Sequence, residues 1–164
     1  MRFEDRFTDK AKNVLNNAQT SAEQLGHVYI GSEHILMGLL MEDGGTANKV
    51  LRKNGIDLRL VRERIEKQNG VGEKGDIPPQ GLTPRAKRII EIAAGEAARL
   101  GHSYIGTEHM LMGILREYDS TAAGILIATG VDLNKLYTDV INLFDSAEQR
   151  GKKTVAAAIR SVRM

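Results

Sequence analysis

The sequence predicts an all-α fold, built as two tandem four-helix repeats related by a pseudo-two-fold, eight helices in all. First, residues 8–58 align without a gap on residues 83–133 when the chain is shifted against itself by 75 positions. Second, apolar residues recur at helical spacing in both copies. Third, three Phe, four Tyr and no Trp leave an aliphatic core that suits packed helices. A two-fold repeat of this length indicates one duplicated unit rather than a long solenoid.

The first helix of each repeat is predicted from a stripe of apolar residues at i, i+3, i+4 and i+7 spacing. The stripe contains Ala11, Val14, Leu15, Ala18, Ala22 and Leu25 in repeat one, and Ala86, Ile89, Ile90, Ala93, Ala97 and Leu100 in repeat two. Thr8 and Thr83 precede these stripes as N-caps, and Pro84 takes the first helical position, where its missing N–H costs nothing within the helix. Gly26 and Gly101 follow as C-terminal stops.

The second helix of each repeat is expected to be capped by Ser32 or Thr107. Its apolar residues are Leu36, Leu39 and Leu40, matched by Leu111, Ile114 and Leu115. Gly38 and Gly113 lie within these helices and should permit a close approach to a neighbouring helix.

Two shorter patterns complete each repeat. A third helix is expected over residues 46–54, ending at Gly55, and its counterpart ends at Gly130. Asp57 and Asp132 should cap the fourth helices. Their apolar residues are Leu58, Val61 and Ile65, mirrored by Leu133, Leu136 and Val140. No strand is predicted.

These patterns divide the chain into one domain over residues 1–145 and a basic segment over residues 146–164, which is a tail or the start of a linker. Repeat one covers residues 7–67, a linker rich in Gly and Pro covers 68–81, and repeat two covers 82–145. Residues 155–162 have the composition for a turn or two of helix.

Composition excludes several classes of function. The chain has no cysteine, so disulfides, thiolate metal sites and thiol nucleophiles are excluded. No apolar run has the length of a membrane span and the N-terminus lacks a signal-peptide pattern, so a cytoplasmic protein is expected. The net charge is +2, but residues 146–164 alone carry +4, which leaves −2 on residues 1–145. A nucleic-acid partner is therefore not expected.

The repeated motif carries a resemblance to a known family. It reads Leu-Gly-His-Val-Tyr-Ile-Gly-Ser-Glu-His over residues 25–34 and Leu-Gly-His-Ser-Tyr-Ile-Gly-Thr-Glu-His over residues 100–109. With the preceding Arg-Phe-Thr of residues 6–8, it resembles the Clp N-terminal domain, most nearly the ClpC branch, over roughly residues 3–145.

The resemblance implies a substrate- and adaptor-binding domain that precedes the rings of an AAA+ protein unfoldase working with ClpP. Adaptors such as MecA or the arginine kinase McsB are the implied protein partners, in a stress-response system of protein degradation. No G-x-x-x-x-G-K-[ST] phosphate loop occurs in this chain, so no enzyme activity and no cofactor are expected in it. A free-standing Clp-N protein that regulates a larger Clp ATPase is the alternative.

The resemblance also implies phosphoarginine binding at two equivalent sites. Glu33 and Glu108 would bind the guanidinium-derived group. Free backbone N–H groups at the helix starts by Thr8 and Thr83 would receive the phosphate. A simpler interpretation remains open, in which each Glu only favours a helix N-terminus and each Thr is an ordinary cap.

The four histidines belong to the same motif and suggest a third hypothesis, a metal-dependent hydrolase. No pair has the i, i+4 spacing of a helical zinc site, and we expect the rings to bond backbone carbonyls instead, with no metal bound. Ser32, Glu33 and His34 are adjacent at a helix start and point in different directions, so they cannot form a catalytic relay. The histidines are His27, His34, His102 and His109.

Overall fold

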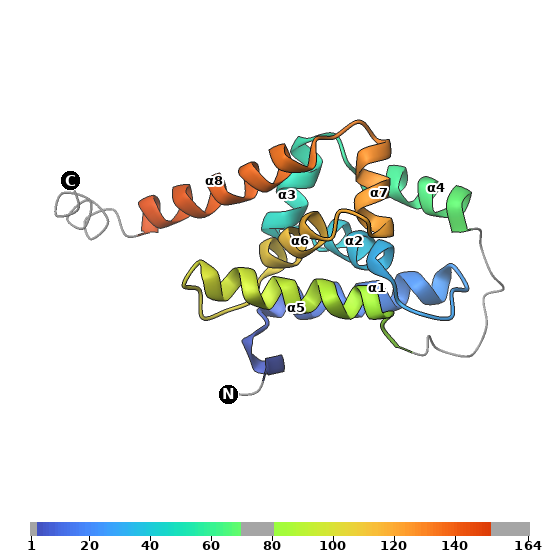
Figure 1. The fold of residues 1–164 in the computed structure, drawn as a ribbon, viewed down its shortest axis with the longest axis horizontal. Helices are drawn as coiled ribbons and strands as arrows, with labels where there is room; N and C mark the ends of the chain where they lie inside the picture. The colour runs from blue at the N-terminus through green and yellow to red at the C-terminus, as the bar shows by residue number, and fades with distance from the viewer. Residues whose placement is uncertain (1–2, 70–80, 152–164) are drawn as a thin grey trace.

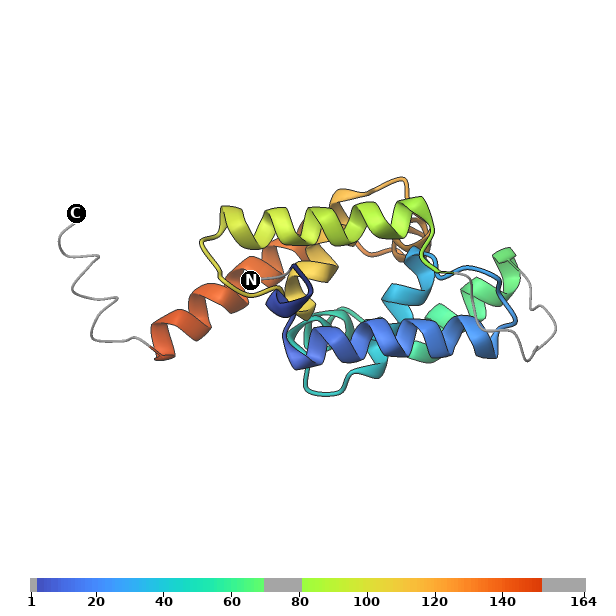
Figure 2. The same cartoon turned by 90° about the horizontal axis from the view of Figure 1, so that it is seen from below.

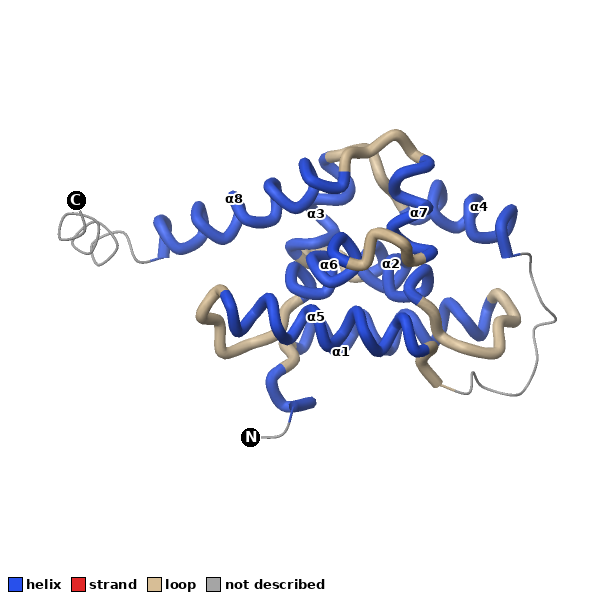
Figure 3. Tube along the Cα trace, viewed as in Figure 1, coloured by secondary structure: helices blue, strands red, loops and turns tan. Residues whose placement is uncertain are grey.

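The computed structural model describes residues 3–69 and 81–151 of the 164-residue chain. It confirms the all-α prediction: the described residues form a short 3₁₀ helix and eight α-helices. Figures 1 and 3 show how these helices are arranged. In chain order the elements are η1 (Phe3–Arg6), α1 (Asp9–Gln24), α2 (Ser32–Met41), α3 (Thr46–Lys53), α4 (Leu58–Asn69), α5 (Pro84–Arg99), α6 (Thr107–Arg116), α7 (Thr121–Ala128) and α8 (Leu133–Gly151). None of the helices in these ranges combines the length and apolar character needed to cross a bilayer.

The long helices α1 and α5 run in opposite directions, and Figure 2 shows them separated when the molecule is seen from below. Each packs against the second helix of its own repeat, α1 against α2 and α5 against α6. The predicted stripes are buried as expected, apart from Leu15 and Leu100, which are partly buried against the core. One continuous apolar core therefore joins both repeats.

Four of the predicted helix caps are present. The Thr8 hydroxyl accepts a hydrogen bond from the Ala11 amide at 3.1 Å, and Thr83 accepts one from Ala86 at the same distance. Asp57 and Asp132 likewise accept bonds from the first turns of α4 and α8. These caps satisfy N–H groups that have no acceptor inside the helix.

The expected capping role of Ser32 and Thr107 is wrong. The N-caps of α2 and α6 are the preceding glycines, Gly31 and Gly106, and Ser32 and Thr107 are already the first helical residues. Their hydroxyls instead cross to the other repeat. Ser32 accepts a hydrogen bond from the amide of Ala122 in α7, at 3.0 Å. Thr107 accepts one from the amide of Ala47 in α3, at 3.3 Å. Each cap thus serves a helix distant in sequence.

Close packing at Gly38 and Gly113 follows the prediction. A Cβ at Gly38 would lie 2.4 Å from the carbonyl oxygen of Val14, and a Cβ at Gly113 would lie 2.5 Å from that of Ile89. Any side chain at these positions would collide with backbone. The absence of a Cβ lets α2 and α6 lie directly on α1 and α5.

Two boundaries extend past the predicted repeats. Helix α4 runs to Asn69, two residues into the expected linker, and α8 continues beyond residue 145 to Gly151. The remaining linker residues 70–80, and the helical turn expected over 155–162, lie outside the described residues.

Candidate binding site

The starts of the two long helices are each tied to a loop of the opposite repeat. The Thr8 amide donates to the carbonyl of Ile105 at 3.0 Å, while the Ile105 amide donates to the carbonyl of Arg6 at 2.8 Å. In the symmetric position, the Thr83 amide donates to the carbonyl of Ile30 at 2.9 Å. The two isolated parallel bridges that result, Phe7 with Ile105 and Ile30 with Leu82, are the only strand-like pairings in the described part of the chain.

Because only Gly106 separates Ile105 from the start of α6, the first bridge brings Thr8 of repeat one beside Glu108 of repeat two. Both residues line an open hollow of about 330 Å³. We call this hollow the Thr8 site; its lining residues are Thr8, Asp9, Lys10, Gly44, Thr46, Tyr104, Thr107 and Glu108. Its backbone and side chains come from both repeats, so neither repeat alone can form it.

The carboxylate of Glu108 folds back over the start of its own helix. A Cβ at Gly106 would lie only 1.8 Å from Glu108 Oε1. Burial raises the pKa of Glu108 above its usual value, while bonds from its own backbone N–H and from the Thr46 hydroxyl, together with nearby His102, act in the opposite direction. A cationic partner at this carboxylate would favour its ionised form.

We call the symmetric arrangement the Thr83 site. It comprises the residues equivalent to the first set after the 75-residue shift: Thr83, Pro84, Arg85, Asp119, Thr121, Tyr29, Ser32 and Glu33. Glu33 has 12% of its side chain exposed and lies over Gly31, where a Cβ would be 2.0 Å from its Oε1. Backbone hydrogen bonds therefore connect Thr83 to the loop that precedes Glu33, and Thr8 to the loop that precedes Glu108.

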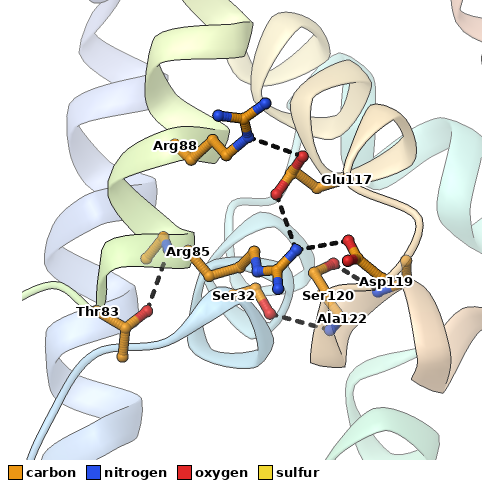
Figure 4. Close-up of polar contacts among 10 residues, drawn as sticks. Ser32, Thr83, Arg85, Arg88, Glu117, Asp119, Ser120 and Ala122 are labelled. Carbon is orange, nitrogen blue, oxygen red and sulfur yellow. Dashed lines mark hydrogen bonds and ion pairs between the residues drawn. The ribbon is translucent and has the colours of Figure 1, made fainter.

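The Thr83 site also contains an ion-pair network, shown in Figure 4. The Arg85 guanidinium donates to Glu117 at 3.0 Å and also bonds Asp119. Arg88 donates to the other oxygen of Glu117 at 3.1 Å. Arg85 extends from the first turn of α5 toward the α6–α7 loop, where both acids lie.

The histidines form two equivalent pairs, and in each pair the buried ring, His34 or His109, bonds a backbone amide where a carbonyl was predicted. His34 Nδ1 accepts a 2.8 Å hydrogen bond from the Gly31 amide. Its Nε2 therefore carries the proton and donates to His27 Nδ1 at 2.7 Å. Burial, reinforced by His27, lowers the pKa of His34 to about 4.

The second pair repeats this arrangement. His109 Nδ1 accepts from the Gly106 amide at 2.9 Å, and its Nε2 lies 2.9 Å from His102 Nδ1. Burial, again with a contribution from the neighbouring ring, lowers the pKa of His109 to about 4. These pairs hold the loops that precede α2 and α6. Within residues 3–69 and 81–151, no three His, Asp or Glu side chains gather in a way that could hold a metal ion.

Several residues of these sites were not identified from the sequence. Lys10 and Thr46 line the Thr8 site, and Arg85 and Asp119 stand at the matching positions of the Thr83 site. The repeat contained a signal for one pair, because Lys10 and Arg85 are both cations at equivalent positions. The sequence contained no such signal for Thr46 or Asp119, since their approach to these sites depends on how the third helix of one repeat packs against the other repeat.

The sequence matches the family model for the Clp repeat (R) N-terminal domain over residues 6–128 and again over 81–160. The chaperone protein ClpB of Oceanobacillus iheyensis is 45% identical over 147 residues, covering 88% of this chain and 18% of that protein. The chloroplastic chaperone protein ClpC1 of Oryza sativa subsp. japonica is 45% identical over 139 residues, covering 85% of this chain and 15% of that protein. The chain thus spans less than a fifth of these two relatives.

Solved structures share the fold. The N-terminal domain of the chaperone ClpD from Arabidopsis thaliana aligns with a TM-score of 0.73 at 24% identity, over 88% of this chain and 97% of that one. The N-domain of ClpV in complex with a VipB peptide aligns with a TM-score of 0.64 at 16% identity, over 82% of this chain and 89% of that one. Both similarities concern the fold.

Proposed function

This chain belongs to the Clp repeat (R) N-terminal domain family, and we propose that it is the substrate- and adaptor-binding domain of a ClpC-type AAA+ unfoldase that works with ClpP. We further propose that it recognises proteins marked by phosphoarginine. The observation that carries this proposal is the Thr8 site, where a helix start and a partly buried carboxylate line one hollow.

The chemistry of the hollow suits a ligand with a cationic group beside an anionic one. At the start of α1, the amides of Asp9 and Lys10 have no hydrogen-bond acceptor within the helix. The next amide, that of Ala11, already bonds the Thr8 hydroxyl. These two amides, the helix dipole and the Lys10 ammonium would receive a phosphate. Glu108 would receive the guanidinium nitrogens.

The same surface would also bind protein partners. Similarity to a ClpV N-domain that was solved with a peptide supports peptide binding by this fold. We propose that adaptors such as MecA or McsB bind here, and that ClpP is reached only through the parent ATPase. The domain itself would perform no chemistry, since its role is to bind. We propose a cytoplasmic location, although the rice relative is chloroplastic.

The proposal is tested by calorimetric titration of phosphoarginine into the purified domain. We expect binding by the wild-type chain, and loss of binding in the double variant Glu33→Ala plus Glu108→Ala. Glu91→Ala is a matched control, because this exposed glutamate of α5 belongs to neither site. Free arginine and inorganic phosphate, titrated separately, should bind at least about tenfold more weakly, because each satisfies half of the site. Unchanged binding in the double variant would remove both carboxylates from the site.

A further inference from the structure

The two sites differ in ways that bear directly on anion binding, although the repeat makes their backbones equivalent. Three positions carry the difference: Asp9 against Pro84, Lys10 against Arg85, and Gly44 against Asp119. Each can be evaluated from the contacts in the structure.

The first difference concerns backbone donors. In α1 the first two helical residues are Asp9 and Lys10, and both supply an N–H group without an intrahelical acceptor. In α5 the first helical residue is Pro84, which has no N–H. The Thr83 site therefore offers an anion one backbone donor where the Thr8 site offers two.

The second difference concerns the cation. Lys10 Nζ lies 3.1 Å from the position that a Cβ of Gly44 would occupy, so it stands at the rim of the hollow. Among the described side chains, no carboxylate forms an ion pair with it. Arg85, by contrast, already bonds both Glu117 and Asp119. An anion arriving at the Thr83 site would have to compete with these carboxylates for the guanidinium.

The third difference concerns fixed negative charge. Asp119 takes the place of Gly44 and adds a carboxylate to the Thr83 site, next to the cation that a phosphate would use. Asp9 adds a negative charge to the Thr8 site as well, and both aspartates are exposed, so water and salt screen their charges alike. The difference lies in the ion pair, because Asp119 bonds Arg85 whereas Asp9 forms no ion pair with Lys10 in the described part of the chain.

We propose that the two sites are unequal, with the Thr8 site as the high-affinity site for a phosphorylated guanidine group, and with the Arg85–Asp119 pair as an internal competitor that weakens the Thr83 site. This inference rests on the proposed function, and it assigns specificity to residues outside the Thr and Glu positions of the repeated motif. Asp119 acts through Arg85, so it is a positioning residue.

The test follows backbone amide chemical shifts while phosphoarginine is titrated into the isotope-labelled chain, because shifts near Thr8 and Thr83 report each site separately. We expect saturation at the Thr8 site at a concentration at least about fivefold lower than at the Thr83 site. Asp119→Gly combined with Pro84→Ala should strengthen the Thr83 site by about fivefold, since it frees Arg85 from one carboxylate and restores an N–H group. The Thr8 site should be unaffected by that variant.

A second pair of variants addresses the cation at the Thr8 site. Lys10→Gln should weaken that site by about fivefold, while Lys12→Gln, on the same helix but outside the hollow, should leave it unchanged. The reverse exchange at Gly44 is unsuitable, because its φ of +83° would strain a side chain.

The outcomes separate the two proposals. Equal saturation at both sites in the wild-type chain would overturn the inequality and leave phosphoarginine recognition standing. Unequal sites that do not respond to the Asp119→Gly and Pro84→Ala exchange would overturn the role of the ion pair. Absence of shifts at both sites would contradict the proposed function, and with it this inference.

Discussion

The Thr107 hydroxyl accepts a hydrogen bond from the Ala47 amide at 3.3 Å, so a side chain of repeat two caps a helix of repeat one. Gly45, the residue before α3, has no side chain with which to do this. The Ser32 bond to Ala122 makes the reciprocal connection. The repeats therefore stabilise each other's third helices, which are also the helices whose starts approach the binding sites.

Removal of this hydroxyl should destabilise the fold. We expect Thr107→Ala to lower the free energy of unfolding by about 1–2 kcal/mol, because the buried Ala47 amide loses its acceptor. Thr107→Ser keeps the hydroxyl and should retain most of the stability. Denaturant unfolding measures both variants, and equal losses in the two would show that the Thr107 methyl group, not its hydroxyl, matters.

The glycine before each second helix should be needed for ligand binding rather than for folding. Gly106 has φ −103° and ψ −179°, an extended conformation that any residue adopts. A Cβ there would instead displace the Glu108 carboxylate, whose oxygen lies 1.8 Å from the Cβ position. We expect Gly106→Ala to weaken phosphoarginine binding at the Thr8 site while the melting temperature changes little. Loss of stability without loss of affinity would contradict this assignment.

The glycines inside α2 and α6 should behave in the opposite way. Gly113→Ala would place a Cβ 2.5 Å from the backbone oxygen of Ile89, and we expect it to destabilise the fold by about 1–3 kcal/mol through overpacking. Gly95→Ala is the matched control, because this glycine of α5 has no neighbouring atom within 4 Å of the Cβ position. It should stabilise the chain by about 0.5–1 kcal/mol through helix propensity. Thermal unfolding of the two variants distinguishes these effects.

The buried histidines should make stability depend on pH. The pKa values of His34 and His109 fall to about 4 in the folded chain, from 6.5 in an unfolded one. Their contribution is fully present above pH 6.5 and is lost as the pH falls toward 4, because only the unfolded chain binds the protons in that range. Each contributes at most about 3 kcal/mol.

Nitrogen-detected NMR titration of the imidazoles measures these values directly. We expect His34 and His109 to remain neutral at pH 5.5, with the proton on Nε2, because their Nδ1 atoms accept backbone amides. Protonation of either ring with a midpoint near 6.5 would contradict the buried pairing. The free energy of unfolding should then be larger at pH 7 than at pH 5.

Much of this fold could be predicted from the sequence, because its signals are local. The stripe that begins at Ala11, the caps at Thr8 and Thr83, and the stops at Gly26 and Gly101 act within one helix or its first neighbour. The same reasoning failed at Ser32 and Thr107, where a residue type that usually caps its own helix serves a helix of the other repeat.

By itself, the sequence determined the duplicated helical unit, since periodicity and capping depend on residues a few positions apart, while the candidate Thr and Glu positions came from the resemblance of the repeated motif to a known family. Only the tertiary structure decided that Thr8 stands beside Glu108, because that neighbourhood depends on a bridge between residues of different repeats. It also decided that Arg85 is engaged by Glu117 and Asp119, since ion pairs across more than 30 positions depend on how helices pack rather than on local pattern.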